Sequence, residues 1–334
     1  MKNNLIYGNV FGGSAGEAAP NIADDPRYEY SPAFFSGYVN ETNVTIGGGY
    51  RCTTAYTIGD KTYKVGDAVS SEEYNAFTSG RTNWTAITPP TIYASVYGGG
   101  QDGHVRRDTK VTVLGGEIGV PYKATSDSRT ALLTNYGLDN PQWMHRGNIY
   151  GGGSGITKYK YDFNYDGDTE DDNEQNYSNS SGSVTRFTEV NVKGGTIHRN
   201  VYGGGSMGSV GAPKIDESQG DLSKKDLSEE NKANWGKQSQ NTVNIGGGSS
   251  VVTIGTPFDT TKGWSYDKTY GGEVYGACRG DATLDAEQFG TSIWTQVLIK
   301  NGANILGNVF GGGDAGKVKR DAEVIIGERK QNNP

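Results

Sequence analysis

The most specific chemical pattern in the sequence is an acidic stretch, DFNYDGDTEDDNE, at residues 162–174. Oxygen-bearing side chains at its first, third and fifth positions, followed by a glycine at its sixth, have the spacing that curls a calcium-binding loop around one cation. The twelfth position is asparagine, where such a loop usually has a bidentate glutamate. The alternative interpretation is an acidic loop that is merely solvated. The candidate Ca²⁺ ligands are Asp162, Asn164, Asp166, Asp168 and Glu170.

A second pattern imitates a nucleotide-binding loop. The stretch NVFGGGDAGKV at 308–318 contains Gly-x-Gly-x-x-Gly and falls one residue short of a P-loop. A dinucleotide-binding fold uses that motif once, between a strand and a helix. Here similar runs recur six times, and no long amphipathic helix follows any of them. We therefore interpret these glycines as corners of a repeated structure.

Residues for catalysis do not form a recognisable set. The three histidines, His104, His145 and His198, fall at unrelated places in the sequence, and no common hydrolase or metalloprotease motif is present. Cys52 and Cys278 stand in unlike contexts and indicate neither a disulfide framework nor a metal cluster. Polysaccharide-active enzymes need converging carboxylates, which the repeated strands do not offer. We expect a protein that is not an enzyme, and we keep a carbohydrate-active enzyme with acids supplied by inserts as an alternative.

Composition narrows the class of partner. The chain of 334 residues carries a net charge of −7, which argues against a nucleic-acid partner. No apolar run approaches the ~18 residues of a membrane span. The 52 glycines follow no Gly-x-y period and stand beside valine, isoleucine and aromatic residues, so they indicate neither collagen nor a flexible linker.

Two phrases recur along the chain and organise it. Six copies of a GNVYGGG-like phrase alternate with six copies of a TxVxI-like phrase, and the bare unit is roughly 26 residues long. Each unit reads as two short β-type runs with alternating apolar residues, joined by glycine-rich corners. A unit this small buries no face of its own, so copies must stack. We predict an all-β, right-handed parallel β-solenoid of six coils that spans residues 1–334 as one domain.

Long polar inserts interrupt the repeat, and we expect them at two kinds of corner only. Residues 50–92 read as a small subdomain, with a β-hairpin that turns at Gly59–Asp60 and a helical turn that begins at Ser71. The predicted inserts are residues 17–41, 50–92, 119–145, 157–187, 212–240, 255–270 and 281–294.

Two sets of residues recur at equivalent places. The last glycine of each corner is expected to be a geometric requirement; the six are Gly16, Gly103, Gly155, Gly208, Gly280 and Gly316. The aromatic residues of the same phrase should stack in one ladder; they are Phe11, Tyr97, Tyr150, Tyr202, Tyr275 and Phe310. One reading of the ladder is a structural column that fills the core, and the other is an exposed platform for sugar rings.

The two ends of the sequence lie within coils, because no atypical capping unit is evident. One reading is that the chain is an excerpt of a longer protein. The other is that the bottom coil of one copy stacks on the top coil of a neighbour, which gives end-to-end self-association into a fibre.

The alternation of GNVYGGG and TxVxIxGG phrases resembles the β-solenoid regions of large adhesin-like surface or secreted proteins of Bacteroidota. It is also loosely similar to the repeats of chlamydial polymorphic outer-membrane proteins. The resemblance implies a bacterial extracellular or cell-surface location and an attachment or structural role, and it assigns no functional residue. The primary expectation is a non-catalytic module that presents loops to a glycan or a host surface protein.

Overall fold

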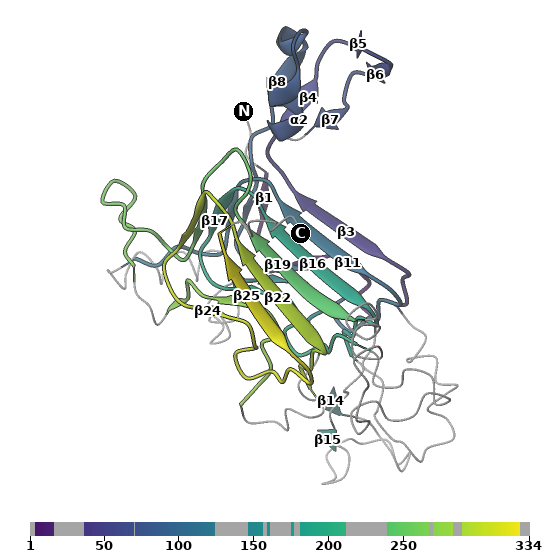
Figure 1. The fold of residues 1–334 in the computed structure, drawn as a ribbon, viewed down its shortest axis with the longest axis vertical. Coiled ribbons are helices and arrows are strands. Elements are labelled where there is room, and N and C mark those ends of the chain that lie inside the picture. The colour runs from purple at the N-terminus through teal and green to yellow at the C-terminus, as the bar shows by residue number, and fades with distance from the viewer. Residues whose placement is uncertain are drawn as a thin grey trace, which may run out of the picture.

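Three parallel sheets of six strands each form the walls of the molecule (Figure 1). The structure, a computed structural model, describes residues 4–16, 37–69, 71–123, 146–155, 159–160, 175–176, 181–211, 239–266, 270–282 and 289–327. Each coil contributes one strand to each wall, and successive coils pair in parallel, which confirms the parallel β-solenoid with six coils.

The strands of the walls are as follows. The first wall contains β1 (Leu5–Ile6), β9 (Thr91–Ile92), β12 (Glu117–Ile118), β17 (Gly195–Ile197), β20 (Val252–Ile254) and β23 (Ala303–Ile305). The second wall contains β2 (Val10–Phe11), β10 (Val96–Tyr97), β13 (Ile149–Tyr150), β18 (Val201–Tyr202), β21 (Val274–Tyr275) and β24 (Val309–Phe310). The third wall contains β3 (Thr42–Ile46), β11 (Thr109–Val113), β16 (Phe187–Val192), β19 (Gln240–Ile245), β22 (Trp294–Ile299) and β25 (Ala322–Ile326).

The expectation of two β-runs per coil is wrong, because a three-residue corner splits one run into two strands. Ile197 ends β17 and Val201 begins β18, and residues 198–200 turn the chain between the first and second walls. A fourth line of contact follows the second wall. It consists of single parallel bridges that link Val39 to Val105, Val105 to Val184 and Val184 to Val210.

The core consists of valine and isoleucine side chains that alternate with outward polar residues along the strands. In β11 the side chains of Val111 and Val113 are fully buried, while Lys110 is exposed. A column of threonines reinforces the stack, since their hydroxyls donate to glycine carbonyl oxygens 2.5–2.6 Å away; the donors are Thr42, Thr109, Thr188 and Thr295. Stacking therefore satisfies buried polar groups as well as apolar ones.

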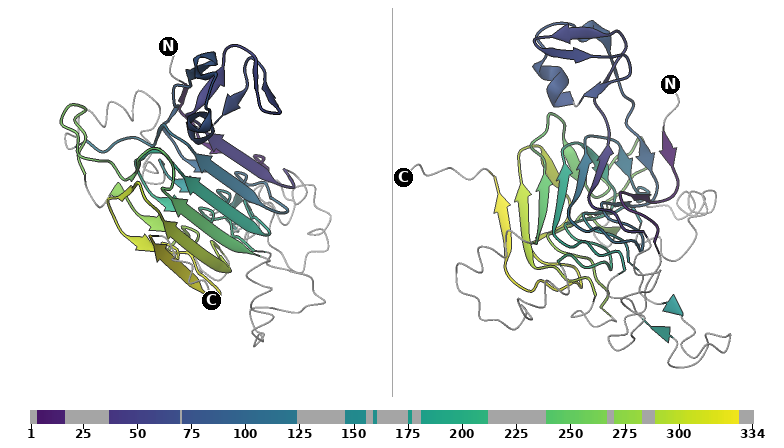
Figure 2. Two further views of the ribbon diagram at one scale, coloured as in Figure 1. Left: turned by 45° about the horizontal axis from the view of Figure 1, so that its top comes forward. Right: turned by 90° about the vertical axis from the view of Figure 1, so that its right-hand side faces the viewer.

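One insert folds as a subdomain that stands away from the coils (Figures 1 and 2). It contains β4 (Tyr50–Cys52), β5 (Tyr56–Ile58), β6 (Lys61–Tyr63), β7 (Ala68–Val69), α2 (Ser71–Ala76), the 3-10 turn η1 (Arg81–Asn83) and β8 (Trp84–Ala86). Its separate small core includes Cys52, Tyr63, Phe77 and Trp84. The hairpin at Gly59–Asp60 and the helix that begins at Ser71 are both present. The predicted boundary at residue 92 is wrong, because β9 belongs to the first wall.

Five inserts share one way of leaving the coils. At each, the chain departs and returns through two glycines that both have a positive φ, between 60° and 105°. A Cβ built on one member of each pair would lie 2.5–3.0 Å from a backbone atom of the other. We call these pairs the glycine necks; they are Gly16/Gly37, Gly155/Gly182, Gly280/Gly290, Gly119/Gly147 and Gly255/Gly272.

The necks correct several expectations about inserts and glycines. The predicted inserts 17–41, 157–187 and 281–294 end too late, since Val39, Val184 and Ser292 already belong to coils. Insert 212–240 also ends too late, because Gln240 starts β19, and it leaves from another corner, after Val210. The inserts at 119–145 and 255–270 leave between the first and second walls, so the corners number more than the two kinds expected.

The six recurring glycines are not one equivalent column. The bridge register aligns Gly103 and Gly208 with Gly37 and Gly182, two residues before their valines. At Gly103, Gly208 and Gly316, φ is not positive, and a Cβ would instead meet a carbonyl oxygen of another coil at 2.3–2.6 Å. Close approach requires glycine at these three, whereas Gly16, Gly155 and Gly280 are members of glycine necks.

Candidate functional site at the corner of coils three to five

The aromatic ladder forms as expected, and its four tyrosines are buried, whereas Phe310 in the last coil is 41% exposed. Adjacent ring centroids from Phe11 to Phe310 lie 4.7–5.0 Å apart, and the ring planes are within 14° of parallel. The four tyrosines are at most 6% exposed. The structural reading is therefore confirmed, and the reading as an exposed platform for sugars is wrong.

The candidate calcium ligands at 162–170 lie outside the described residues, and calcium binding there stays a prediction. The strand pair that brackets this stretch is described: β14 (Tyr159–Lys160) pairs antiparallel with β15 (Gln175–Asn176). Within the described ranges, no group of three or more His, Cys, Asp or Glu side chains is placed to hold a metal.

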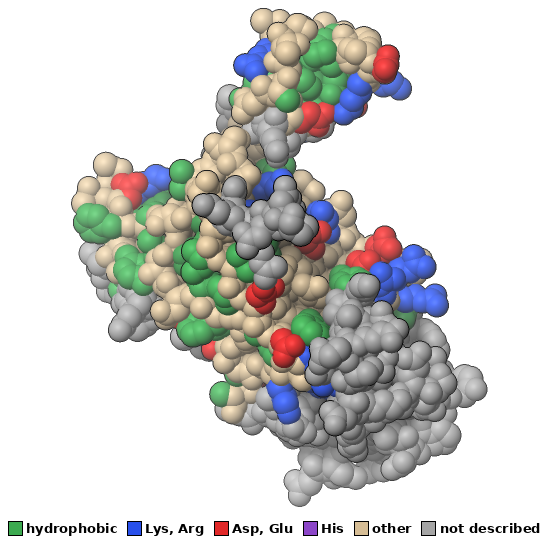
Figure 3. Space-filling view, in the orientation of Figure 1, with side chains coloured by type: hydrophobic (Ala, Val, Ile, Leu, Met, Phe, Trp, Pro, Cys, Tyr) green, Lys and Arg blue, Asp and Glu red, His purple; other side chains and the backbone are tan. Residues whose placement is uncertain are grey.

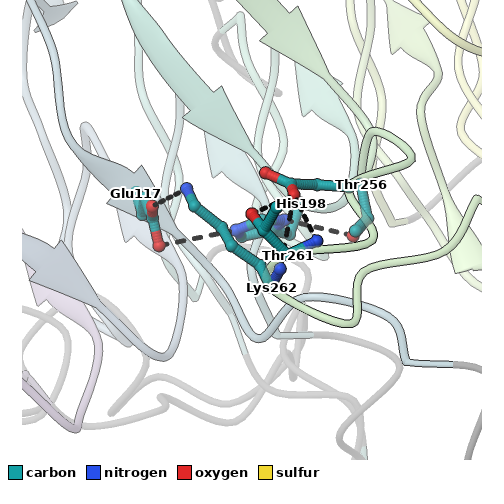
Figure 4. A network of polar contacts seen from close by, with 6 residues as sticks. Glu117, His198, Thr256, Thr261 and Lys262 are labelled. Atoms are coloured by element: carbon teal, nitrogen blue, oxygen red, sulfur yellow. Dashed lines mark hydrogen bonds and ion pairs between the residues drawn. The ribbon is translucent and has the colours of Figure 1, made fainter.

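A polar network around His198 lies where the first wall turns into the second (Figure 4). Three neighbouring coils supply it. Glu117 comes from β12, His198 follows β17 directly, and Thr256 follows β20 after one residue. The neck Gly119/Gly147 lies against His198 and Arg199 on one side, and the neck Gly255/Gly272 marks the same corner of the next coil. His198 and Arg199 thus occupy, in coil four, the place that glycine necks occupy in coils three and five.

Thr256 links His198 to the coil-three insert through two hydrogen bonds. The amide N–H of Tyr122 donates to Thr256 Oγ1 at 3.0 Å, and Thr256 Oγ1 lies 3.1 Å from His198 Nδ1. The hydroxyl oxygen has two lone pairs, so it can accept from Tyr122 and either donate to a bare Nδ1 or accept from a protonated one. Nε2 faces Glu117 Oε2 at 4.0 Å, which is too long for a hydrogen bond, so this contact is electrostatic.

The hairpin that follows Thr256 covers His198. An Asx turn shapes its tip, where Asp259 Oδ1 accepts from the amide and hydroxyl of Thr261 at 2.9 and 2.6 Å. The ring of Trp264 meets the His198 ring at 89°, with centroids 4.9 Å apart. Lys262 Nζ lies 4.0 Å from the centre of the Trp264 ring and 3.7 Å from Glu117 Oε1.

A second set of contacts ties the two inserts together. The amide of Ser265 donates to the carbonyl oxygen of Tyr122 at 3.0 Å, and the Tyr122 ring stacks on Tyr270 with centroids 4.2 Å apart. Arg199 donates to the carbonyl oxygen of Tyr270, and its guanidinium lies 5.0 Å from the centre of that ring. The start of the coil-three insert, the coil-four corner and the coil-five insert therefore form one surface.

Burial controls the titration of this site. Loss of solvent lowers the pKa of the His198 imidazole, and the cations of Arg199 and Lys262 lower it further, while Glu117 opposes them. The pKa of Glu117 is lowered by His198 first and then by Lys262, against its own desolvation. At neutral pH the imidazole is uncharged and the carboxylate is ionised.

The order Thr256–His198–Glu117 follows that of a nucleophile, a base and an orienting acid. However, Thr256 and His198 are only 4% and 2% exposed, so a dissolved substrate does not reach the hydroxyl. What the geometry provides is a latch that holds the 255–266 hairpin on the coils.

Polar residues also gather beside the aromatic ladder in the last coils. The Tyr202 hydroxyl donates to Asp314 Oδ2 at 3.4 Å, and the Tyr275 hydroxyl donates to Glu273 Oε2 at 2.5 Å. Burial raises the pKa of Asp314, and the neighbouring Glu273 raises it further. Each carboxylate already accepts from a ladder tyrosine, so this cluster completes the hydrogen bonding of the ladder.

Comparisons with protein families, with curated proteins and with solved structures found no match to this chain. In the part of the chain that the structure describes, no helix has the length and apolarity to cross a membrane.

Proposed function

We propose that this chain is a non-catalytic, extracellular adhesin-like module that displays insert loops on a β-solenoid rod for attachment. The observation that carries the proposal is the glycine neck. It recurs at five insertion points on two corners, which is expected if the rod serves to carry loops whose content is free to change.

Coils with and without an insert have the same corner length. Seven residues separate the ladder aromatic from the bridging valine in coil two, from Gly98 to His104. Coil three also has seven when its insert is left out: 151–155 and 182–183. The insert is therefore added to a complete corner, and it replaces none of the residues that build the coil.

Insert surfaces offer groups suited to a partner. Phe258 and Tyr266 on the latched hairpin are 74% and 40% exposed, and Val65 on the subdomain is 67% exposed. Figure 3 shows hydrophobic, cationic and anionic side chains interspersed over the projecting subdomain. Exposed aromatic rings beside charged groups suit a glycan or a protein surface. The bacterial cell-surface location follows from the resemblance of the repeat phrases.

The experiment is a binding screen of the purified chain against an immobilised glycan panel and against extracellular-matrix proteins. The variant Phe258→Ser tests the hairpin, and Val65→Ser is a matched control on the other insert. Binding that one of these changes weakens at least tenfold supports the proposal. The proposal is overturned if the chain binds nothing in the screen, or if binding survives removal of every insert.

A second candidate is a fibre subunit that stacks end to end. It is favoured by apolar side chains left open on the first and last coils, where Leu5 is 46% exposed and Ile326 is 76% exposed. A further coil on either end would cover them, and in this candidate the coil belongs to a second copy.

A further inference from the structure

We infer that the 255–266 hairpin is an acid-released element: it is docked on the coils while His198 is neutral and detaches when His198 takes up a proton. The inference rests on the proposed function, because it concerns how one of the displayed loops is held. It starts from the position of the imidazole, which is buried beneath Trp264 and between two inserts.

The site holds a neutral ring better than a charged one. A neutral imidazole makes one hydrogen bond, between Nδ1 and the Thr256 hydroxyl, whose oxygen also accepts from the amide of Tyr122. The imidazolium carries a hydrogen on both ring nitrogens, and the buried Nε2 has no hydrogen-bond partner, since Glu117 Oε2 is 4.0 Å away. A buried charge with an unsatisfied donor opposes docking.

The charges around the ring come from every element that packs against it. Glu117 on β12 attracts the imidazolium from 4.0 Å, while Arg199 on the same corner and Lys262 on the hairpin repel it. Thr256 and Trp264 are neutral. Glu117 also shares its carboxylate with Lys262 and is partly exposed, so it offsets burial only in part.

The direction of the pH effect follows from linkage. In the released hairpin, His198 titrates near its ordinary value of 6.5, and in the docked state burial lowers its pKa. The released state therefore binds more protons below pH 6.5, so docking is complete above that pH and weakens as the pH falls toward the docked pKa. Glu117 acts in a separate window, because its pKa is lowered from the ordinary value of 4.5 and it stays ionised over the range in which His198 titrates.

Hydrogen exchange measured by mass spectrometry tests this without any ligand, so its outcome is independent of whether the attachment function holds. The Ser265 N–H reports docking, because it is bonded to the carbonyl oxygen of Tyr122 outside the hairpin, whereas the Trp264 N–H is bonded to Asp259 and reports whether the hairpin itself stays folded. Exchange is measured at about pH 7.5 and about pH 5.5, on either side of the released value, and corrected for its intrinsic pH dependence. Below pH 6.5 and above the docked pKa, protection of the Ser265 amide should fall roughly tenfold for each unit by which the pH is lowered, while wall amides such as Val111 keep their protection.

Two variants and a control separate the cause. His198→Gln removes the titration, so hairpin protection should no longer depend on pH. Glu117→Gln removes the attraction that favours the imidazolium, so the acid loss should become larger. His104→Gln changes the other described buried histidine, whose Nδ1 lies 3.1 Å from Ser183 Oγ, and should behave as the parent. The inference is overturned if the parent shows equal hairpin protection at both pH values, or if His198→Gln still loses hairpin protection at the lower pH. It is also overturned if Glu117→Gln does not enlarge this loss. If His198→Gln loses protection in the walls as well, its fold is damaged, and the Glu117→Gln variant alone tests the inference.

Discussion

Two ladder tyrosines, Tyr150 and Tyr202, are the largest fully buried side chains among the described residues. Tyr150 stacks between Tyr97 and Tyr202 and is fully buried. Tyr150→Ala should lower the free energy of unfolding by about 3–5 kcal/mol, because it removes a buried ring and leaves a cavity within a packed column. Chemical denaturation followed by circular dichroism measures this.

The matched control is Tyr150→Phe, which keeps the ring and the stack. Phe11 and Phe310 already occupy the ends of the ladder, so we expect a change within about 1 kcal/mol. A loss in Tyr150→Phe comparable to that in Tyr150→Ala would show that the hydroxyl, rather than the stacked ring, stabilises the column.

Glycines of the corner phrase face a steric limit set by the neighbouring coil. A Cβ on Gly152 would lie 2.8 Å from the amide nitrogen of Gly205, whereas a Cβ on the equivalent Gly312 would meet nothing within 4 Å. Neither has a positive φ, so the comparison isolates the contact between coils. Gly152→Ala should cost about 1–3 kcal/mol, and Gly312→Ala should leave the denaturation midpoint unchanged. Equal effects would contradict the steric explanation.

At the scale of the element, the glycine necks predict that whole inserts are removable. Deleting residues 156–181 joins Gly155 directly to Gly182 and leaves the seven-residue corner of coil two. Stability should change by no more than about 1 kcal/mol, because removing a loop lowers the entropic cost of closing it. Deleting 156–182 is the control: the corner then has six residues, and thermal unfolding should begin at a clearly lower temperature. Similar melting of the two deletions would refute the neck as the insertion point.

The same insert contains the candidate calcium ligands, so its deletion also tests whether the chain binds calcium there. Calorimetric titration of the parent with Ca²⁺ should give heat that is absent from the 156–181 deletion and strongly reduced in Asp162→Ala. Equal heats for the parent and for Asp162→Ala would refute calcium binding at this site.

Elements with a local, repeated signal were predictable from the sequence. The six corner phrases predicted the coils and the aromatic ladder, and Gly59–Asp60 predicted a hairpin that the structure contains. The sequence pattern predicts one β-run where the structure has a strand in each of the first and second walls, because Ile197 and Val201 share parity across the three-residue corner. A recurring Gly-x-Val, as at 103–105 and 182–184, was the available signal for the fourth line of contact.

The latch had no such signal. His198 and Thr256 are 58 residues apart, and the residues that meet there occupy unlike places in their coils. Their contact arises from stacking: three corners lie side by side although no single coil encodes the network. The sequence signal for the latch is a histidine at a place where the neighbouring coils have glycine. This signal can be recognised only once the coil register is known.

At the scale of the whole molecule, the last described coil leaves a stacking surface open. The last coil exposes Phe310, Val324 and Ile326, side chains that point inward in the equivalent places of earlier coils. A second copy stacked on this end would place its Val10 and Phe11 over Val309 and Phe310 and its Ile46 over Ile326, in the register that every internal pair already uses. Open strand edges of this kind pair readily with another chain.

The chain prepared as these 334 residues should therefore associate as its concentration rises, and light scattering coupled to size exclusion would show it. Ile326→Lys places a charge on the stacking surface and should restore a monomer. Ile325→Lys is the matched control, since this neighbour on β25 is in register with Leu298 and lies on the opposite face of the wall from Ile326, so its charge does not enter the contact. Association that Ile325→Lys abolishes as completely as Ile326→Lys would place the contact on the outer face of the third wall. A chain that stays monomeric at every concentration would exclude end-to-end stacking, and the rod would then act through its loops alone.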